Sequence, residues 1–125
     1  MRYVLDTTLL IDVAHGMPAA RTVFGTLFDE PNDLYTCDVI TAEALSGGSE
    51  EQRRDIGRLL DVLEYVSTIP DAARHAAETR RRRDRTSHRT LGDALIGAVA
   101  WSLGATVITR NPGDFIAQGI PVLTY

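Results

Sequence analysis

The sequence predicts an α/β domain with a mainly parallel central sheet flanked by helices. Short apolar runs of strand length alternate with longer segments of helical periodicity, the pattern of right-handed strand–helix–strand crossovers. With 125 residues, 44% of them hydrophobic, the chain is long enough to bury one core. No repeat, low-complexity tract or linker divides it. We therefore expect residues 1–125 to form a single domain.

The chain opens with an apolar strand, residues 2–5, that leads directly into Asp6. Thr7 and Thr8 can cap the following helix, which Gly16 ends. Asp6 is thus expected at the carboxyl end of a buried strand, where open α/β sheets bind ligands. The structural alternative is that Asp6 only helps Thr7 to cap the helix.

Next come a helix over residues 17–28 and a strand over 34–37, with Val39–Ile40 continuing the strand. Glu43 is expected in the first turns of a short helix that ends at Gly47–Gly48. Taken alone, a glutamate there is ordinarily a solvated partner of the helix dipole.

An amphipathic helix is predicted over residues 49–63, with Ser49 as its N-cap, followed by a strand over 65–67. A further helix over 71–85 has a strongly basic end. Residues 80–89 hold six arginines and one aspartate, although the whole chain carries a net charge of −4. All 13 basic residues are arginines, which excludes chemistry that needs a lysine.

The stretch from residue 91 to 115 is the most informative part of the chain. Asp93 opens an almost wholly apolar helix, residues 94–103, which belongs in a core. A buried strand, 105–108, follows it, and a turn then presents Asp114. Residues 120–123 give a last strand at a sheet edge. Viewed alone, Asp93 is as well explained by a helix cap as by a functional site.

Four acids lie at the ends of predicted elements. Asp6 and Asp114 follow buried strands, Glu43 follows another strand closely, and Asp93 opens the helix that precedes a strand. In a parallel sheet all four can gather at one carboxyl edge. Carboxylates ~4 Å apart repel by about 4 kcal/mol per pair at an effective dielectric of ~20. A fold keeps such a cluster chiefly when a divalent cation neutralises it, and hard oxygen ligands favour Mg²⁺ or Mn²⁺ over zinc.

Four motifs follow one another along the chain: LDTTLLID (5–12), ITAEALSG (40–47), DALIGA (93–98) and TRNPGDF (109–115). With these motifs the sequence resembles the PIN-domain nucleases, and within them the VapC toxins of bacterial toxin–antitoxin pairs. The resemblance implies a PIN-like fold. It also implies that Asp6, Glu43, Asp93 and Asp114 are catalytic and bind one or two Mg²⁺ ions, with Mn²⁺ as an alternative. Family members differ over whether the position of Asn111 or of Asp114 supplies the fourth acid, and here only Asp114 is a carboxylate.

The resemblance further assigns supporting roles to Thr109 and Asn111, and the hydroxyl of Thr7 or Thr8 is expected to fix the orientation of Asp6. It implies a Mg²⁺-dependent endoribonuclease, the toxin of a type II toxin–antitoxin system, which acts on RNA, binds a cognate antitoxin and forms a homodimer. Beside a carboxylate pocket, an arginine run is expected to grip a phosphate backbone, and the residues concerned are Arg81, Arg82, Arg83 and Arg85. A single cysteine and short apolar runs lead us to expect a cytoplasmic protein without a membrane segment.

Three other functions are compatible with parts of the pattern. A housekeeping PIN-type nuclease for RNA processing or DNA cleavage would keep the same fold and metal site. A phosphate-sensing receiver-like module would also place acids on a parallel sheet, but it needs a lysine that this chain lacks. A non-catalytic nucleic-acid-binding domain would leave the acidic quartet without a purpose. RNA cleavage measured with Mg²⁺ and with EDTA separates the enzymes from the other two.

Overall fold

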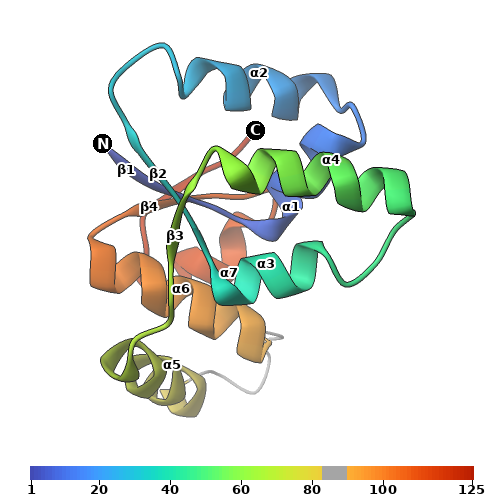
Figure 1. The fold of residues 1–125 in the computed structure, drawn as a ribbon. Coiled ribbons are helices and arrows are strands. Elements are labelled where there is room, and N and C mark those ends of the chain that lie inside the picture. Colours follow the sequence, from blue (N-terminus) through green and yellow to red (C-terminus); the bar gives the residue numbers. More distant parts are fainter. Residues whose placement is uncertain (83–89) are drawn as a thin grey trace.

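The computed structural model describes residues 1–82 and 90–125. In these residues one sheet of five strands is surrounded by seven helices (Figure 1). The strands are β1 (Arg2–Leu5), β2 (Asp33–Cys37), β3 (Glu64–Val66), β4 (Thr106–Ile108) and β5 (Val122–Leu123). The helices are α1 (Thr7–Ala14), α2 (Pro18–Thr26), α3 (Asp38–Ala44), α4 (Glu50–Asp61), α5 (Pro70–Arg82), α6 (Leu91–Leu103) and α7 (Pro112–Ile116). The predicted α/β class is confirmed.

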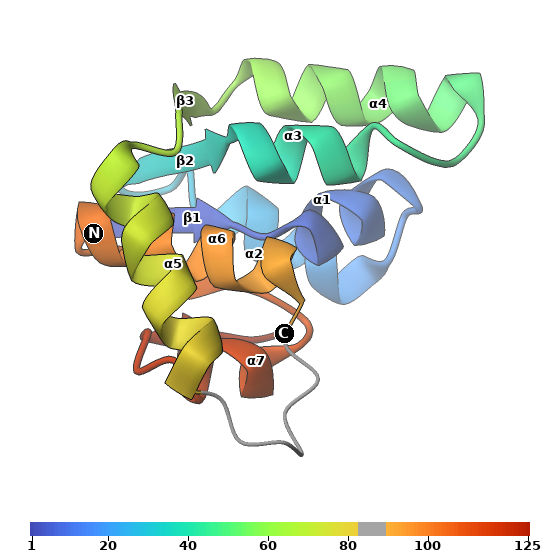
Figure 2. The same cartoon turned by 90° about the horizontal axis from the view of Figure 1, so that it is seen from below.

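The sheet has the strand order β3-β2-β1-β4-β5, and every neighbouring pair is parallel. In the central strand β1, Val4 lies opposite Tyr35 of β2 and Val107 of β4. Because the strands are parallel, their carboxyl ends share one edge, where β1 and β2 run straight into α1 and α3 (Figure 2). The last strand, β5, forms a sheet edge as predicted.

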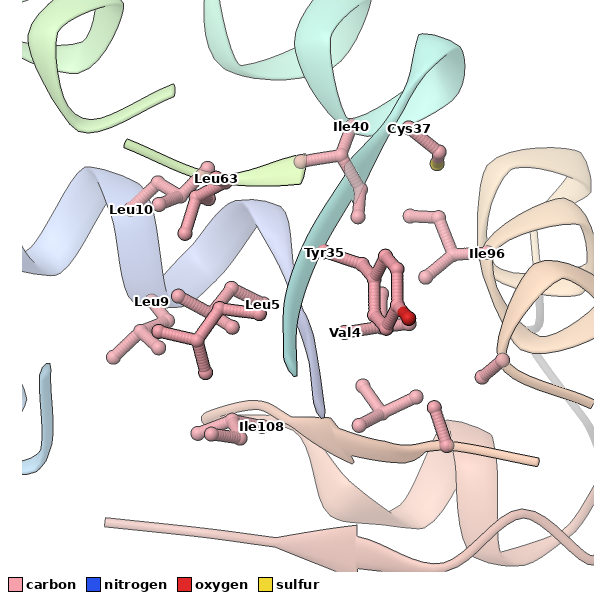
Figure 3. Close-up of a cluster of buried hydrophobic side chains, with 14 of the residues drawn as sticks. Val4, Leu5, Leu9, Leu10, Tyr35, Cys37, Ile40, Leu63, Ile96 and Ile108 are labelled. Carbon is pink, nitrogen blue, oxygen red and sulfur yellow. The ribbon is translucent and has the colours of Figure 1, made fainter. Parts of the chain in front are cut away.

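Helices cover both faces of the sheet, with α2 and α4 on one side and α5, α6 and α7 on the other (Figure 1). Figure 3 shows how β1 serves both layers: Leu5 lies beside Leu9 of α1, whereas Val4 and Tyr35 point toward Ile96 of α6. A strand buried on both faces needs a continuous apolar run, which explains why residues 3–5 do not alternate with polar ones. Among the described residues, no helix combines the length and the apolar character that a bilayer span requires.

Local signals in the sequence determine where several helices begin and end. Ser49 and Gln52 form a reciprocal capping box at the start of α4, with hydrogen bonds of 3.1 and 2.9 Å. Gly104 ends α6 in the left-handed conformation, with a φ of 60°, which glycine adopts without strain. Both ends match the prediction.

Two segments differ from the prediction. Val39 and Ile40 do not extend the strand, because α3 begins one residue earlier at Asp38. The Asp38 carboxylate accepts hydrogen bonds from the Thr68 hydroxyl at 2.7 Å and from the Thr68 N–H, and Ile40 is fully buried, so tertiary contacts override β-propensity here. The turn predicted before Asp114 is instead the first turn of α7, which begins at Pro112.

Candidate metal centre

Asp6 lies between β1 and α1, at the carboxyl end of the central strand. Its side chain is buried, with 4% relative exposure. The Thr109 hydroxyl donates to Asp6 Oδ2 at 2.7 Å, and the Thr8 hydroxyl donates to the same oxygen at 3.2 Å. Burial raises the pKa of Asp6, the two hydroxyls oppose this rise, and the charge of Asp93 adds to it. Within the described residues, the side chains bonded to Asp6 are neutral, and Asp6 has hydrogen bonds but no salt bridge.

Glu43 reaches the same edge of the sheet from α3. The Thr7 hydroxyl donates to Glu43 Oε1 at 3.3 Å. Gly92, in the first turn of α6, gives the carboxylate room: a Cβ atom at position 92 would lie 3.0 Å from Glu43 Oε2. Partial burial raises the pKa of Glu43, and the charges of Asp6 and Asp93 raise it further, while the Thr7 hydroxyl lowers it. Glu43 lies near the end of its helix, and the expectation that it lies in the first turns was wrong because α3 begins at Asp38.

Asp93 lies in the first turn of α6 and forms a capping box with Thr90. The Asp93 N–H donates to Thr90 Oγ1 at 3.1 Å, and the Thr90 N–H approaches Asp93 Oδ2 at 3.5 Å. Burial raises the pKa of Asp93, the charge of Asp114 raises it further, and the bonds to Thr90 lower it. The capping alternative considered for Asp93 is thus present in the structure. The same carboxylate also interacts electrostatically with Asp6, Glu43 and Asp114.

Asp114 is half-buried in the first turn of α7. Thr109, which is fully buried, connects this segment to Asp6, because its hydroxyl also accepts the Asn111 backbone N–H at 3.0 Å. The Asn111 side chain is exposed, so the support that it gives to Thr109 in this structure comes from its main chain.

The four acids influence one another's charge, but they do not form a ready-made ligand shell. In residues 1–82 and 90–125 there is no group of three or more histidine, cysteine, aspartate or glutamate side chains arranged to hold a metal ion. The chemistry of the donor set nevertheless fits a hard divalent cation. The donors are all carboxylate oxygens, Asp6 is a buried charge without an ionic partner in the described residues, and burial and mutual repulsion raise the pKa of Asp6, Glu43 and Asp93.

A second buried acid, Asp12 of α1, was not singled out from the sequence. Its carboxylate, with 3% relative exposure, accepts Arg110 Nη1 at 2.8 Å and the Tyr125 hydroxyl at 2.6 Å. Burial and the bond to Asp12 raise the pKa of Tyr125 well above its usual range. The available signal was an aspartate between Ile11 and Val13 in an otherwise apolar helix. Its partners lie 98 and 113 residues away, beyond the reach of local patterns.

The arginines predicted to bind RNA are only partly described. Arg81 and Arg82 are exposed in the last turn of α5, and they lie 3.9 and 3.7 Å from the Glu78 carboxylate. Arg83 and Arg85 lie outside the described residues. The structure thus leaves Arg81 and Arg82 open to solvent, with part of their charge offset by Glu78.

Comparisons with known proteins agree with this architecture. The model of the PIN domain family matches residues 3–118. Ribonuclease VapC19 of Mycobacterium tuberculosis is 27% identical to the chain over 114 residues, which is 90% of each protein.

Solved structures with the same fold include two complexes. VapBC2 from Rickettsia felis, bound to a DNA fragment from its promoter, has a TM-score of 0.84 and 18% identity, covering 100% of this chain and 99% of that chain. A toxin–antitoxin complex from Klebsiella pneumoniae has a TM-score of 0.76 and 27% identity, covering 98% of this chain and 96% of that chain.

Proposed function

The chain belongs to the PIN domain family, and from that premise we propose that it is a Mg²⁺-dependent endoribonuclease that acts as the toxin of a type II toxin–antitoxin system. The observation that carries the proposal is the carboxylate of Asp6, which is buried at the carboxyl end of the central strand without a salt-bridge partner in the described residues. Its charge interacts with those of Asp93 and Glu43. The name of the relative VapC19 supports ribonuclease activity, and the toxin–antitoxin complexes among the structural neighbours support the toxin role.

We assign Asp6 and Asp93 as direct ligands of the cation, and Glu43 and Asp114 as the acids that complete the site. Mn²⁺ can replace Mg²⁺ in an all-oxygen site of this kind. When bound, the cation supplies Lewis-acid stabilisation of the phosphate oxygens and lowers the pKa of a water molecule.

Hydrogen bonds and packing from neighbouring residues orient the carboxylates of Asp6 and Glu43. The Thr109 and Thr8 hydroxyls fix one oxygen of Asp6, which leaves Oδ1 free of the side-chain bonds that hold Oδ2. The Thr7 hydroxyl holds Oε1 of Glu43, and Gly92 lets that carboxylate rest against the first turn of α6. We propose that Glu43 orients the attacking water. Glu43 is the most exposed of the four acids, and its raised pKa makes it a better proton acceptor than an ordinary glutamate.

We assign the arginine run to the RNA backbone, with Arg81 and Arg82 of α5, together with Arg83 and Arg85, as the contacts. Arginines that meet phosphates strengthen binding without choosing a sequence. Replacing Arg81 and Arg82 with glutamine should weaken RNA binding and lower the slope of log affinity against log salt by about 0.7 per lost contact with a single strand. An unchanged slope would show that these side chains face solvent or another partner.

The proposed partners are the RNA substrate, a cognate antitoxin and a second copy of the chain, and the proposed location is the cytoplasm. Co-expression with the product of a neighbouring small reading frame tests the antitoxin, because a true antitoxin co-purifies with the protein and relieves growth arrest. Light scattering tests the homodimer.

The activity is tested by incubating the purified protein with RNA in Mg²⁺ and in EDTA. We expect cleavage in Mg²⁺, none in EDTA, and none with Asp6→Asn in either. Asp61→Asn is the matched control, because Asp61 is an exposed residue at the far end of α4, and its activity should equal that of the wild type. Cleavage by Asp6→Asn, or by the wild type in excess EDTA, would overturn the proposed function.

A further inference from the structure

Gln118 connects two of the acid-bearing turns. It follows α7 and is half-buried. Its Nε2 donates to the main-chain carbonyl of Asp93 at 3.1 Å and to that of Asp114 at 3.0 Å. One amide group therefore joins the first turn of α6 to the first turn of α7, across 25 residues of sequence on one side and four on the other.

The packing around Gln118 is built for this side chain. Gly97 lies one turn after Asp93 in α6, and a Cβ atom there would lie 2.1 Å from Gln118 Oε1 and 2.8 Å from its Cδ. Only a glycine at position 97 leaves room for the amide in its present place. Oε1 itself is buried without a hydrogen-bond partner among the described residues, which is an unfavourable state for a polar atom. An apolar side chain would fill the same space without that penalty, so the benefit of glutamine lies in its two donated bonds.

A connection between the first turns of α6 and α7 opposes the repulsion between the acids that these turns carry. The carboxylates of Asp93 and Asp114 carry like charges, and their repulsion is one reason, after burial, why the pKa of Asp93 is raised. Without a bound cation, that repulsion disfavours the close approach of the two turns. A neutral amide that bonds both carbonyls opposes the separation without adding a charge to the site.

We propose that Gln118 is a positioning residue that holds Asp93 and Asp114 at the spacing from which they bind the divalent cation together. This inference rests on the proposed function, because it assumes that these acids bind a cation. It assigns Gln118 no contact with RNA and no part in proton transfer.

The test is the affinity of the full-length protein for Mn²⁺ alone, measured by titration calorimetry without RNA. Gln118→Met keeps the length of the side chain but removes the donor, and we expect it to bind Mn²⁺ about tenfold or more weakly than the wild type. Gln52→Met is the matched control. It removes the chain's other glutamine, which closes the capping box of α4, so it should lower the melting temperature but leave the affinity for Mn²⁺ unchanged.

A double-mutant cycle separates positioning from general destabilisation. In an Asp114→Asn background, Gln118→Met should cause little further loss of affinity, because the pair that Gln118 positions is already broken. If Gln118→Met lowers affinity by the same factor in both backgrounds, the proposed coupling is absent and the inference falls.

Gly97 provides a second route if Gln118→Met folds poorly. Gly97→Ala should displace the amide and weaken both folding and Mn²⁺ binding. Combining Gly97→Ala with Gln118→Ala removes the clash, so the melting temperature should recover while the affinity stays low. Recovery of the affinity as well would overturn the inference. If the wild type itself binds no Mn²⁺, the proposed function fails; if the wild type binds Mn²⁺ and Gln118→Met binds it equally well, only the role of Gln118 fails.

Discussion

Asp6 and Asp12 are both buried at or within α1, with 4% and 3% relative exposure, but their charges meet opposite surroundings. Asp12 bonds the Arg110 guanidinium at 2.8 Å and the Tyr125 hydroxyl at 2.6 Å. Asp6 accepts hydrogen bonds from the neutral hydroxyls of Thr109 and Thr8, and the charge of Asp93 adds a smaller repulsion. Because a buried charge is costly unless it is paired, the protein has stabilised one aspartate and left the other in an unfavourable state.

We interpret the difference as that between a structural role for Asp12 and the functional role proposed for Asp6. The Asp12 cluster ties α1 to the end of β4 and to the last residue of the chain, so it completes the fold without any ligand. Asp6 has no such ionic partner in the described residues, and under the proposed function a bound cation would supply the opposite charge. A buried charge without an ionic partner, as at Asp6, next to a comparable charge that is paired, as at Asp12, is what a binding site is expected to show.

The largest expected change in the free energy of unfolding is for a substitution of Asp12, the aspartate that has an ionic partner. Asp12→Asn removes the charge that holds Arg110 and Tyr125, and should destabilise the protein by about 2–4 kcal/mol in urea unfolding, below the maximum for a buried pair because Arg110 is 49% exposed. The loss should be the same with Mg²⁺ and with EDTA. A change of less than about 0.5 kcal/mol, as expected for the exposed control Asp61→Asn, would show that the cluster is not structural.

A smaller effect of opposite sign is expected for Asp6→Asn in EDTA. The substitution removes a buried charge and its repulsion with the other acids, while its amide oxygen can still accept from the Thr109 hydroxyl. The metal-free variant should therefore be more stable than the metal-free wild type, by about 1 kcal/mol. Destabilisation comparable to that of Asp12→Asn would mean that Asp6 is held in place by its charge.

The smallest expected effect is the pH dependence of the difference in stability between metal-free Asp6→Asn and the metal-free wild type. The pKa of Asp6 is raised by folding above its ordinary value of 3.8, so the folded protein binds more protons than the unfolded chain between the two values. Stability due to this group then falls as the pH rises through that window. In EDTA, the advantage of Asp6→Asn should be greatest near pH 7.5 and should shrink as the pH is lowered toward 4. An advantage that grows toward acid pH would contradict the raised pKa.

Most of the fold was predictable because local patterns determine it. The apolar runs identified β1, β2 and β4, and the Ser49 and Gly104 signals located two helix ends. The helical state of Val39 and Ile40 was not predictable, because it depends on the contacts of Asp38 with Thr68, 30 residues away. The predicted position of Glu43 in the first turns of its helix was wrong for the same reason, because α3 begins at Asp38.

The sequence predicted which acids belong to the candidate site, but not which residues contact them. The positions of the four acids next to predicted strands, together with the resemblance to PIN-domain nucleases, identified acids whose charges interact pairwise in the structure. The choice of Asp6, Asp93, Glu43 and Asp114 as metal ligands remains a proposal. Sequence patterns could not show that Thr109 bonds Asp6 across 103 residues, or that Gly92 makes room for Glu43. They also missed Asp12 and Gln118, whose partners are brought to them only by the folded chain.

The most direct test of the account compares Mg²⁺-induced stabilisation in the wild type, Asp6→Asn and Asp12→Asn. At about ten times its dissociation constant, Mg²⁺ should stabilise the wild type by about 1.4 kcal/mol, a rise in melting temperature of roughly 5 °C. Asp12→Asn should melt at a lower temperature but show the same rise, and Asp6→Asn should show none. An equal rise in Asp6→Asn and the wild type would contradict the claim that Asp6, buried without an ionic partner among the described residues, binds the cation.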